Sequence, residues 1–125
     1  MPVIYLSPSL QPFNEYVTGS NEQAVMNELA DKMVPYLRAC GIRYTRSNPD
    51  MTLGQVIRES NAGYYDLHLA LHSNAAAGDL AGKVRGSDAY YYTYSALGKK
   101  AAEILAKNLK KIYPIPEKVR AVPTT

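Results

Sequence analysis

The chain has little cysteine, no long apolar run and no internal repeat. Its one cysteine, Cys40, excludes an internal disulfide framework. No apolar stretch approaches the roughly 18 residues of a membrane span, and no charged segment followed by an apolar one marks a secretion signal. A Gly-rich phosphate-binding loop is also absent. We therefore expect neither a membrane span nor a signal peptide in this chain.

A length of 125 residues with 46% hydrophobic residues predicts one domain, residues 1–125, that is large enough to bury a core. The net charge of +3 is mildly basic. Such a charge fits contact with an acidic polymer, although most charge of this kind is solvated surface. We expect no nucleic-acid partner.

Strand-like and helix-like segments alternate along the chain. Apolar and β-branched runs predict strands at 3–6, 42–46, 66–72 and 89–94. Capping residues and helical spacing of apolar residues predict helices at about 21–40, 53–61 and 96–112, with capping boxes at Ser20–Gln23 and Thr52–Gln55. The residues after Tyr113 contain Pro114, Pro116 and Pro123, and we expect no further helix or strand to close the domain there. This order predicts an α/β fold: three layers, with a mainly parallel sheet and helices on both faces.

Both histidines lie on the strand at 66–72, which its apolar run predicts to be buried and central. Four residues of strand separate His68 from His72 by roughly 13 Å, so they cannot share a metal ion without a bulge. His68 is mid-strand and is typical of a packed, hydrogen-bonded core histidine. His72 lies at the carboxyl end, where open α/β sheets bind ligands, and it is the better candidate for chemistry.

Glu22 lies in the first turn of the first predicted helix, close to the long loop at 10–19. The simplest interpretation is a carboxylate that the helix dipole stabilises. The tyrosines at 90–94 could stack on sugar rings, but tyrosines in strands more often serve packing. The lysines of the third helix are, by default, a solvated face.

Four segments follow one another along the chain: Ile4-Tyr5-Leu6-Ser7-Pro8-Ser9, then Asn21-Glu22 with Met26-Asn27, then Asp66 to Asn74, then Arg85-Gly86 before a Tyr-rich strand. Together they resemble the zinc-dependent N-acetylmuramoyl-L-alanine amidases. These enzymes cut peptidoglycan between the muramic acid lactyl group and the first alanine of the stem peptide. The block His72-Ser73-Asn74-Ala75 is the most specific part of the resemblance.

The resemblance implies roles for several residues. Glu22 and His72 match two of the family's three zinc ligands, whereas His68 matches none. Ser73, Asn74 and Arg85 would contact the substrate or support the metal. Zinc would polarise the scissile amide and activate a water molecule.

Two departures weaken the implied activity. The first ligand position is occupied by Phe13, which cannot bind a metal; Gln11, Asn14 and Glu15 lie nearby, and Glu15 is the substitute we consider. The family's general-base glutamate lies on a late strand that would follow Thr125. The chain would thus lack the last strand-helix portion of the family domain and carry no catalytic residue of its own. We expect zinc binding to be weak or absent.

The resulting expectation is a peptidoglycan hydrolase of the amidase type, impaired in this chain, whose parent protein acts in the cell wall or outside the cell. One alternative is a non-catalytic wall-binding module with an amidase-like shape. Another is an unrelated flavodoxin-like domain. A truncated sheet also leaves an open edge, so we expect a homo-oligomer.

Overall fold

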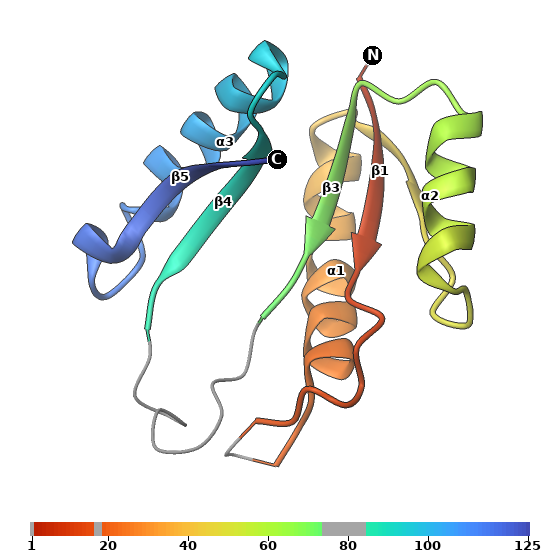
Figure 1. Cartoon of the computed structure of the whole chain (residues 1–125), viewed down its shortest axis with the longest axis horizontal. Helices are drawn as coiled ribbons and strands as arrows, with labels where there is room; N and C mark the ends of the chain where they lie inside the picture. Colours follow the sequence, from red (N-terminus) through yellow and green to blue (C-terminus); the bar gives the residue numbers. More distant parts are fainter. Residues whose placement is uncertain (1, 17–18, 74–84) are drawn as a thin grey trace. The chain divides into compact units, whose positions relative to one another are not determined.

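The computed structural model describes residues 2–16, 19–73 and 85–125 (Figure 1). These residues form a mixed α/β structure with small parallel sheets and three α-helices. The chain divides into two compact units, Met1–Gly82 and Lys83–Thr125, and each is considered by itself. The single domain expected over residues 1–125 stays a prediction. In the ranges described, no helix is both long and apolar enough to cross a membrane.

The first unit is built on a parallel sheet with strand order β2-β1-β3. Its elements are β1 (Val3–Pro8), α1 (Glu22–Ala39), β2 (Arg43–Arg46), α2 (Leu53–Ala62) and β3 (Leu67–Leu71). The core lies on β1, where Tyr5 and Leu6 are fully buried, and Met26 and Ala30 of α1 and Val56 of α2 are buried as well. Each of the five elements was predicted within about two residues of its bounds.

The position of β3 corrects one prediction. Residues 66–72 were expected to form the buried central strand, but β3 lies at the edge of the described sheet, and β1 is central. The apolar residues of β3 are half-buried, and His68 and Ala70 between them are exposed. Its alternation therefore belongs to a strand with one covered face, whereas the β-branched and aromatic run of β1 is covered on both faces.

The helix ends of the first unit follow their capping residues. Asn21 caps α1 by accepting a hydrogen bond from the backbone of Ala24 at 2.9 Å, one residue later than the predicted Ser20. The helix is followed by Gly41 with φ of 71°, a left-handed position that favours glycine. The predicted capping box of α2 is confirmed, with both Thr52–Gln55 hydrogen bonds present.

The second unit contains β4 (Ser87–Tyr92), α3 (Ala96–Leu109), a short 3₁₀ helix (Pro116–Lys118) and β5 (Val119–Thr124). The strands β4 and β5 are parallel, and α3 packs on them through Ala102 and Ala106, while Val119 of β5 is buried. The expectation of no closing element after Tyr113 was wrong. The strand β5 was not predicted because Pro123 has no N–H to donate to a sheet. A strand at a sheet edge nevertheless tolerates proline.

Candidate functional site

The site begins where two neighbouring parallel strands end. The register pairs Pro8 of β1 with Leu71 of β3, and the backbone N–H of Ser9 donates to the carbonyl of Leu71 at 2.9 Å. Ser9 and His72 are therefore the next residues of two paired strands. The carboxyl ends of parallel strands are the usual place for a ligand site in α/β proteins.

Glu22 reaches the same place from the start of α1. The loop after β1 folds back, and the backbone N–H of Glu22 donates to the carbonyl of Asn14 at 2.9 Å. Glu22 is the first residue of the helix, where free N–H groups and the helix dipole favour a negative charge. Its side chain has no exposed surface.

Three side chains surround the Glu22 carboxylate. His72 Nδ1 lies 2.9 Å from Glu22 Oε2, although the two residues are 50 positions apart in the sequence. The Ser9 hydroxyl donates to the same oxygen, and Asn14 Nδ2 donates to Glu22 Oε1 at 3.2 Å. The structure thus joins Glu22 and His72 directly; we call them the Glu22–His72 pair.

These contacts determine the charge of Glu22. Burial alone raises the pKa of a carboxyl group, because it disfavours the charged form. Here hydrogen bonds from Ser9, His72 and Asn14, together with the charge of His72, outweigh burial and lower the pKa of Glu22 below its ordinary value. Glu22 is therefore an ionised carboxylate at neutral pH, as a metal ligand or a partner of imidazole needs to be.

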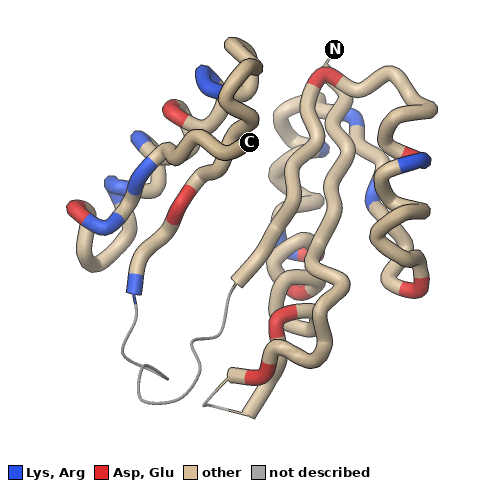
Figure 2. The backbone as a smooth tube through the Cα atoms, viewed as in Figure 1, with Lys and Arg blue, Asp and Glu red and all other residues tan. Residues whose placement is uncertain are grey.

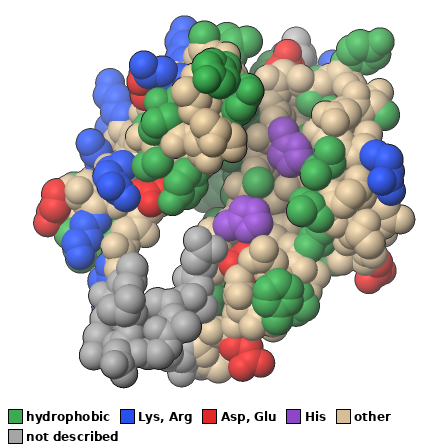
Figure 3. All heavy atoms as spheres, in the orientation of Figure 1, with side chains coloured by type: hydrophobic (Ala, Val, Ile, Leu, Met, Phe, Trp, Pro, Cys, Tyr) green, Lys and Arg blue, Asp and Glu red, His purple; other side chains and the backbone are tan. Residues whose placement is uncertain are grey.

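His72 connects the buried carboxylate to the surface. Half of its side chain is exposed, and Figure 3 shows both histidines of the chain reaching the surface. Nδ1 contacts Glu22, and in the described part of the chain Nε2 makes no hydrogen bond. His72 also lines a groove of about 400 Å³, together with residues of the loop after β1 and of the start of α2. A ligand in this groove can reach the imidazole.

The groove combines polar and apolar groups. Ser9, Gln11 and Thr52 supply hydroxyl and amide groups, and Phe13 and Leu53 are large apolar side chains that are 73% and 67% exposed. A concave surface with a few polar groups among apolar ones is typical of ligand-binding sites.

The fit of these residues to zinc is incomplete. A carboxylate oxygen and an imidazole nitrogen suit zinc, but a catalytic site normally has three protein ligands. Across the described ranges, no three His, Cys, Asp or Glu side chains are grouped as a metal site requires, so Glu15 is not brought to the pair. Phe13 faces solvent and the groove. The described residues therefore do not complete a catalytic zinc site.

The other predicted site residues are placed as follows. Ser73 is half-buried directly after His72, and Asn74 lies outside the described residues. Arg85 is exposed in the second unit, just before β4, so it is not placed relative to the Glu22–His72 pair.

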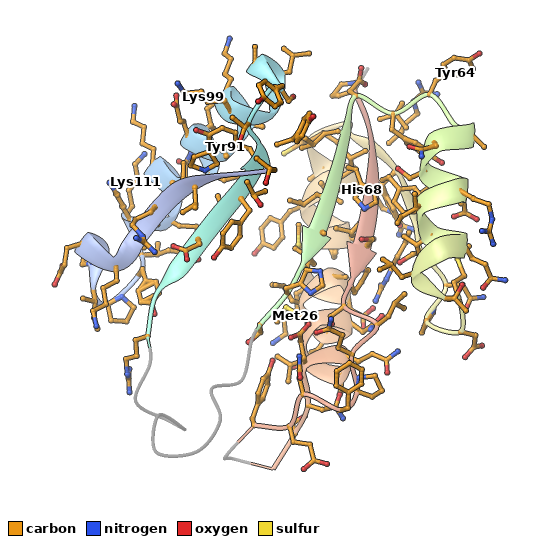
Figure 4. The ribbon with its side chains drawn as sticks, in the orientation of Figure 1. Met26, Tyr64, His68, Tyr91, Lys99 and Lys111 are labelled. Atoms are coloured by element: carbon orange, nitrogen blue, oxygen red, sulfur yellow. The ribbon has the colours of Figure 1, made fainter. Side chains whose placement is uncertain are left out.

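His68 has a structural role (Figure 4). Its Nδ1 is 2.8 Å from the Ser60 hydroxyl and its Nε2 is 2.9 Å from the Ser7 hydroxyl, while its ring centre lies 4.9 Å from that of Tyr5. Partial burial lowers the pKa of His68. The expected hydrogen bonds are confirmed, but the ring is covered on one side only, and His68 does not belong to the buried core.

Ser9 and Asn14 are the site residues that sequence reasoning missed. Ser9 belonged to the Ser-Pro-Ser segment that supported the family resemblance, and Asn14 was considered as a metal ligand only. Both instead donate hydrogen bonds to Glu22. No sequence pattern signals these roles, because they depend on how the loop after β1 folds back to the start of α1.

Comparisons with family models, curated proteins and solved structures found no match for this chain. A function is therefore inferred from its own residues.

Proposed function

We propose that this chain is a peptidoglycan hydrolase domain of the N-acetylmuramoyl-L-alanine amidase type, in which Glu22 and His72 are two of the zinc ligands. One observation carries this proposal. An ionised, fully buried carboxylate at a helix start meets a half-exposed imidazole at the end of a strand 50 residues away. The resemblance described above implies these two residues, and no others in this part of the chain, as ligands.

The groove beside His72 supports a substrate of amide character. Gln11 and Thr52 offer hydrogen-bonding groups that a peptide or an acetamido sugar can use, and Phe13 and Leu53 offer apolar contact. A stem peptide attached to a lactyl group presents both kinds of surface.

The finer features of the fold belong to the same proposal. We infer a three-layer domain with helices on both faces of a mainly parallel sheet. Because Phe13 occupies the third ligand position, catalysis by this chain would be impaired. The parent protein would act in the cell wall or outside the cell.

The exposed Phe13 favours a second candidate, a non-catalytic wall-binding module. With Phe13 at the position of the third ligand and no carboxylate of the described residues brought in to replace it, zinc binding through two ligands would be weak. Such a module would hold peptidoglycan in the groove without cutting it.

A gain-of-binding experiment tests the zinc ligands. Phe13→His supplies the missing third ligand, and we expect zinc affinity, measured by calorimetry, to rise at least about tenfold. Leu53→His is the matched control, because it adds a histidine to the same groove from a similarly exposed position. Glu22→Gln added to Phe13→His should abolish the gain. Equal gains for both histidine variants would contradict the proposal.

Purified peptidoglycan separates the two candidates. For a hydrolase, adding zinc to the Phe13→His variant should release new amino termini slowly, and His72→Ala in that background should stop the release. Wall retention that survives His72→Ala, without any amide release from the Phe13→His variant, would support the binding module instead.

A further inference from the structure

The two units of the chain carry opposite charge. Met1–Gly82 contains five Lys and Arg against eight Asp and Glu, a net charge of −3. Lys83–Thr125 contains nine Lys and Arg against three Asp and Glu, a net charge of +6. Figure 2 shows the basic residues spread over α3, β5 and the turn between them. The modest charge of +3 for the whole chain hides this separation.

The lysines of α3 are concentrated on one side of the helix. At 3.6 residues per turn, Lys99, Lys100, Lys107 and Lys110 fall within an arc of about 100°. Ala102 and Ala106, which are buried, lie outside this arc. The four lysines, which we call the lysine stripe, extend over about 16 Å at 1.5 Å per residue.

The stripe includes one acidic residue and keeps a net positive charge. Among the residues that the structure describes, no salt bridge includes a lysine of α3. Arg120, by contrast, is paired with Asp88 at 3.3 Å between β5 and β4. At 3.6 residues per turn, Glu103, the one acidic residue of α3, falls inside the same arc, so the four lysines and this carboxylate together carry a net charge of +3. Figure 4 labels Lys99 near the start of α3 and Lys111 beyond its end.

The exposed aromatic rings of this unit lie away from the stripe. Tyr91 of β4 faces Gly98 of α3, so the alternation of the strand turns Tyr90 and Tyr92 to the opposite face. Tyr94 contacts Tyr92, with ring centres 5.5 Å apart. Proteins that bind single-stranded nucleic acid combine positive charge with stacking rings on one surface. The stripe has the charge without the rings.

We propose that the lysine stripe of α3 binds a linear polymer of phosphodiesters without bases, a glycerol-phosphate polymer of the cell wall. The stripe offers several point charges along one exposed side of a helix, which suits a flexible chain of phosphates. The choice of a wall polymer rests on the proposed function, because peptidoglycan and such polymers occur together. The affinity for phosphodiesters does not rest on it.

The test measures binding of the full chain to fluorescently labelled poly(glycerol phosphate) over a range of salt concentrations. The stripe variant carries Lys99→Gln, Lys107→Gln and Lys110→Gln. The control carries Lys32→Gln, Arg43→Gln and Arg58→Gln, which are exposed residues of the first unit and remove the same charge. We expect the stripe variant to bind at least about tenfold more weakly, and its log–log salt slope to fall by about 2, at about 0.7 per lysine. The control should stay within about twofold of wild type.

Three outcomes would overturn the inference. The stripe variant and the control could lose affinity equally, which would reduce the effect to net charge. Wild type could fail to bind the polymer. Single-stranded DNA of equal charge could bind more tightly than the polymer and depend on Tyr90 and Tyr92, which would indicate a nucleic-acid partner.

Zinc binding separates this inference from the proposed function. In the Phe13→His background, Glu22→Gln should remove zinc binding and leave polymer binding unchanged, and the three stripe substitutions should do the reverse. If polymer binding depends on the stripe and Glu22→Gln leaves zinc affinity unchanged, the inference is supported and the proposed function is contradicted.

Discussion

At the scale of single residues, the main question is how a fully buried carboxylate is kept charged. Burying a charge without partners is costly. Glu22 avoids this cost because Ser9, Asn14 and His72 all hydrogen-bond its carboxylate, so the loop, the helix and the strand are linked at one point. The site is therefore part of what stabilises the first unit.

Removing one donor should destabilise the fold. We predict that Ser9→Ala lowers the free energy of unfolding by about 1 to 3 kcal/mol, because it leaves a buried charge with one hydrogen bond fewer. The pKa of Glu22 should rise at the same time. Urea unfolding measures the first effect, with Ser20→Ala, at an exposed position before the helix cap, as the control. Equal stability of the two variants would show that Ser9 does not stabilise the carboxylate.

Tyr5 gives a prediction at high pH. Burial, followed by the hydrogen bond to Glu59 at 2.9 Å and the charge of Glu59, raises the pKa of Tyr5 from 10.0 to about 12. A raised pKa means that the neutral phenol stabilises the fold. This contribution is complete below about pH 10 and is lost as the pH rises through about 12.

The variant Tyr5→Phe should be less stable than wild type at neutral pH by about 1 kcal/mol, through the lost hydrogen bond. The difference should shrink from pH 10 upward, because wild type alone loses the contribution of this phenol. Urea midpoints over this range measure the change, with Tyr64→Phe, at a 99% exposed position, as the control. A difference that does not change with pH would contradict the assigned pKa.

Sequence reasoning identified Glu22 and His72 but not their supporting residues. A carboxylate at a helix start and an imidazole at a strand end are visible as patterns, and the family resemblance implied the same two residues. Ser9 and Asn14 act through the path of the loop between β1 and α1, which no periodicity describes. Only the structure reveals the roles of Ser9 and Asn14.

At the scale of elements, local signals predicted most of the secondary structure. The three helices and the first four strands follow apolar spacing and capping residues. β5 was missed because Pro114, Pro116 and Pro123 make the residues after Tyr113 resemble an irregular tail, and its pairing with β4 joins residues about 30 positions apart. The edge position of β3 was missed because an apolar run does not tell which strand of a sheet is central.

The capping box of α2 provides a prediction at this scale. Thr52→Ala removes the hydrogen bond that the Thr52 hydroxyl accepts from the backbone N–H of Gln55, and we expect a loss of about 1 kcal/mol in the free energy of unfolding. Thr52→Ser keeps the hydroxyl and should retain most of the stability that Thr52→Ala loses. Thr52 also lines the groove. Because Thr52→Ser keeps the hydroxyl there, ligand binding by this variant should stay close to wild type. Equal losses for both variants would show that the cap is not responsible.

At the scale of the whole molecule, the two units differ in charge and carry different candidate sites. The first contains the Glu22–His72 pair and its groove, and the second contains the lysine stripe. In the described sheets, β2 and β3 form the outer strands of one, and β4 and β5 are the two strands of the other. Edge strands favour pairing with another chain.

We therefore predict self-association of the purified chain. Light scattering coupled to size exclusion should give a mass of about twice 13.8 kDa at high protein concentration, falling toward the monomer on dilution. A constant monomer mass over the whole concentration range would contradict this prediction.

The most direct test of the metal site uses the fact that the chain has only two histidines. During a zinc titration followed by NMR, we predict that the imidazole signals of His72 shift, while those of His68 stay in place until much higher zinc. Glu22→Gln should remove the response of His72. If His68 responds first, or if His72 responds equally without the Glu22 carboxylate, the two residues do not share a zinc ion and the amidase-type interpretation fails.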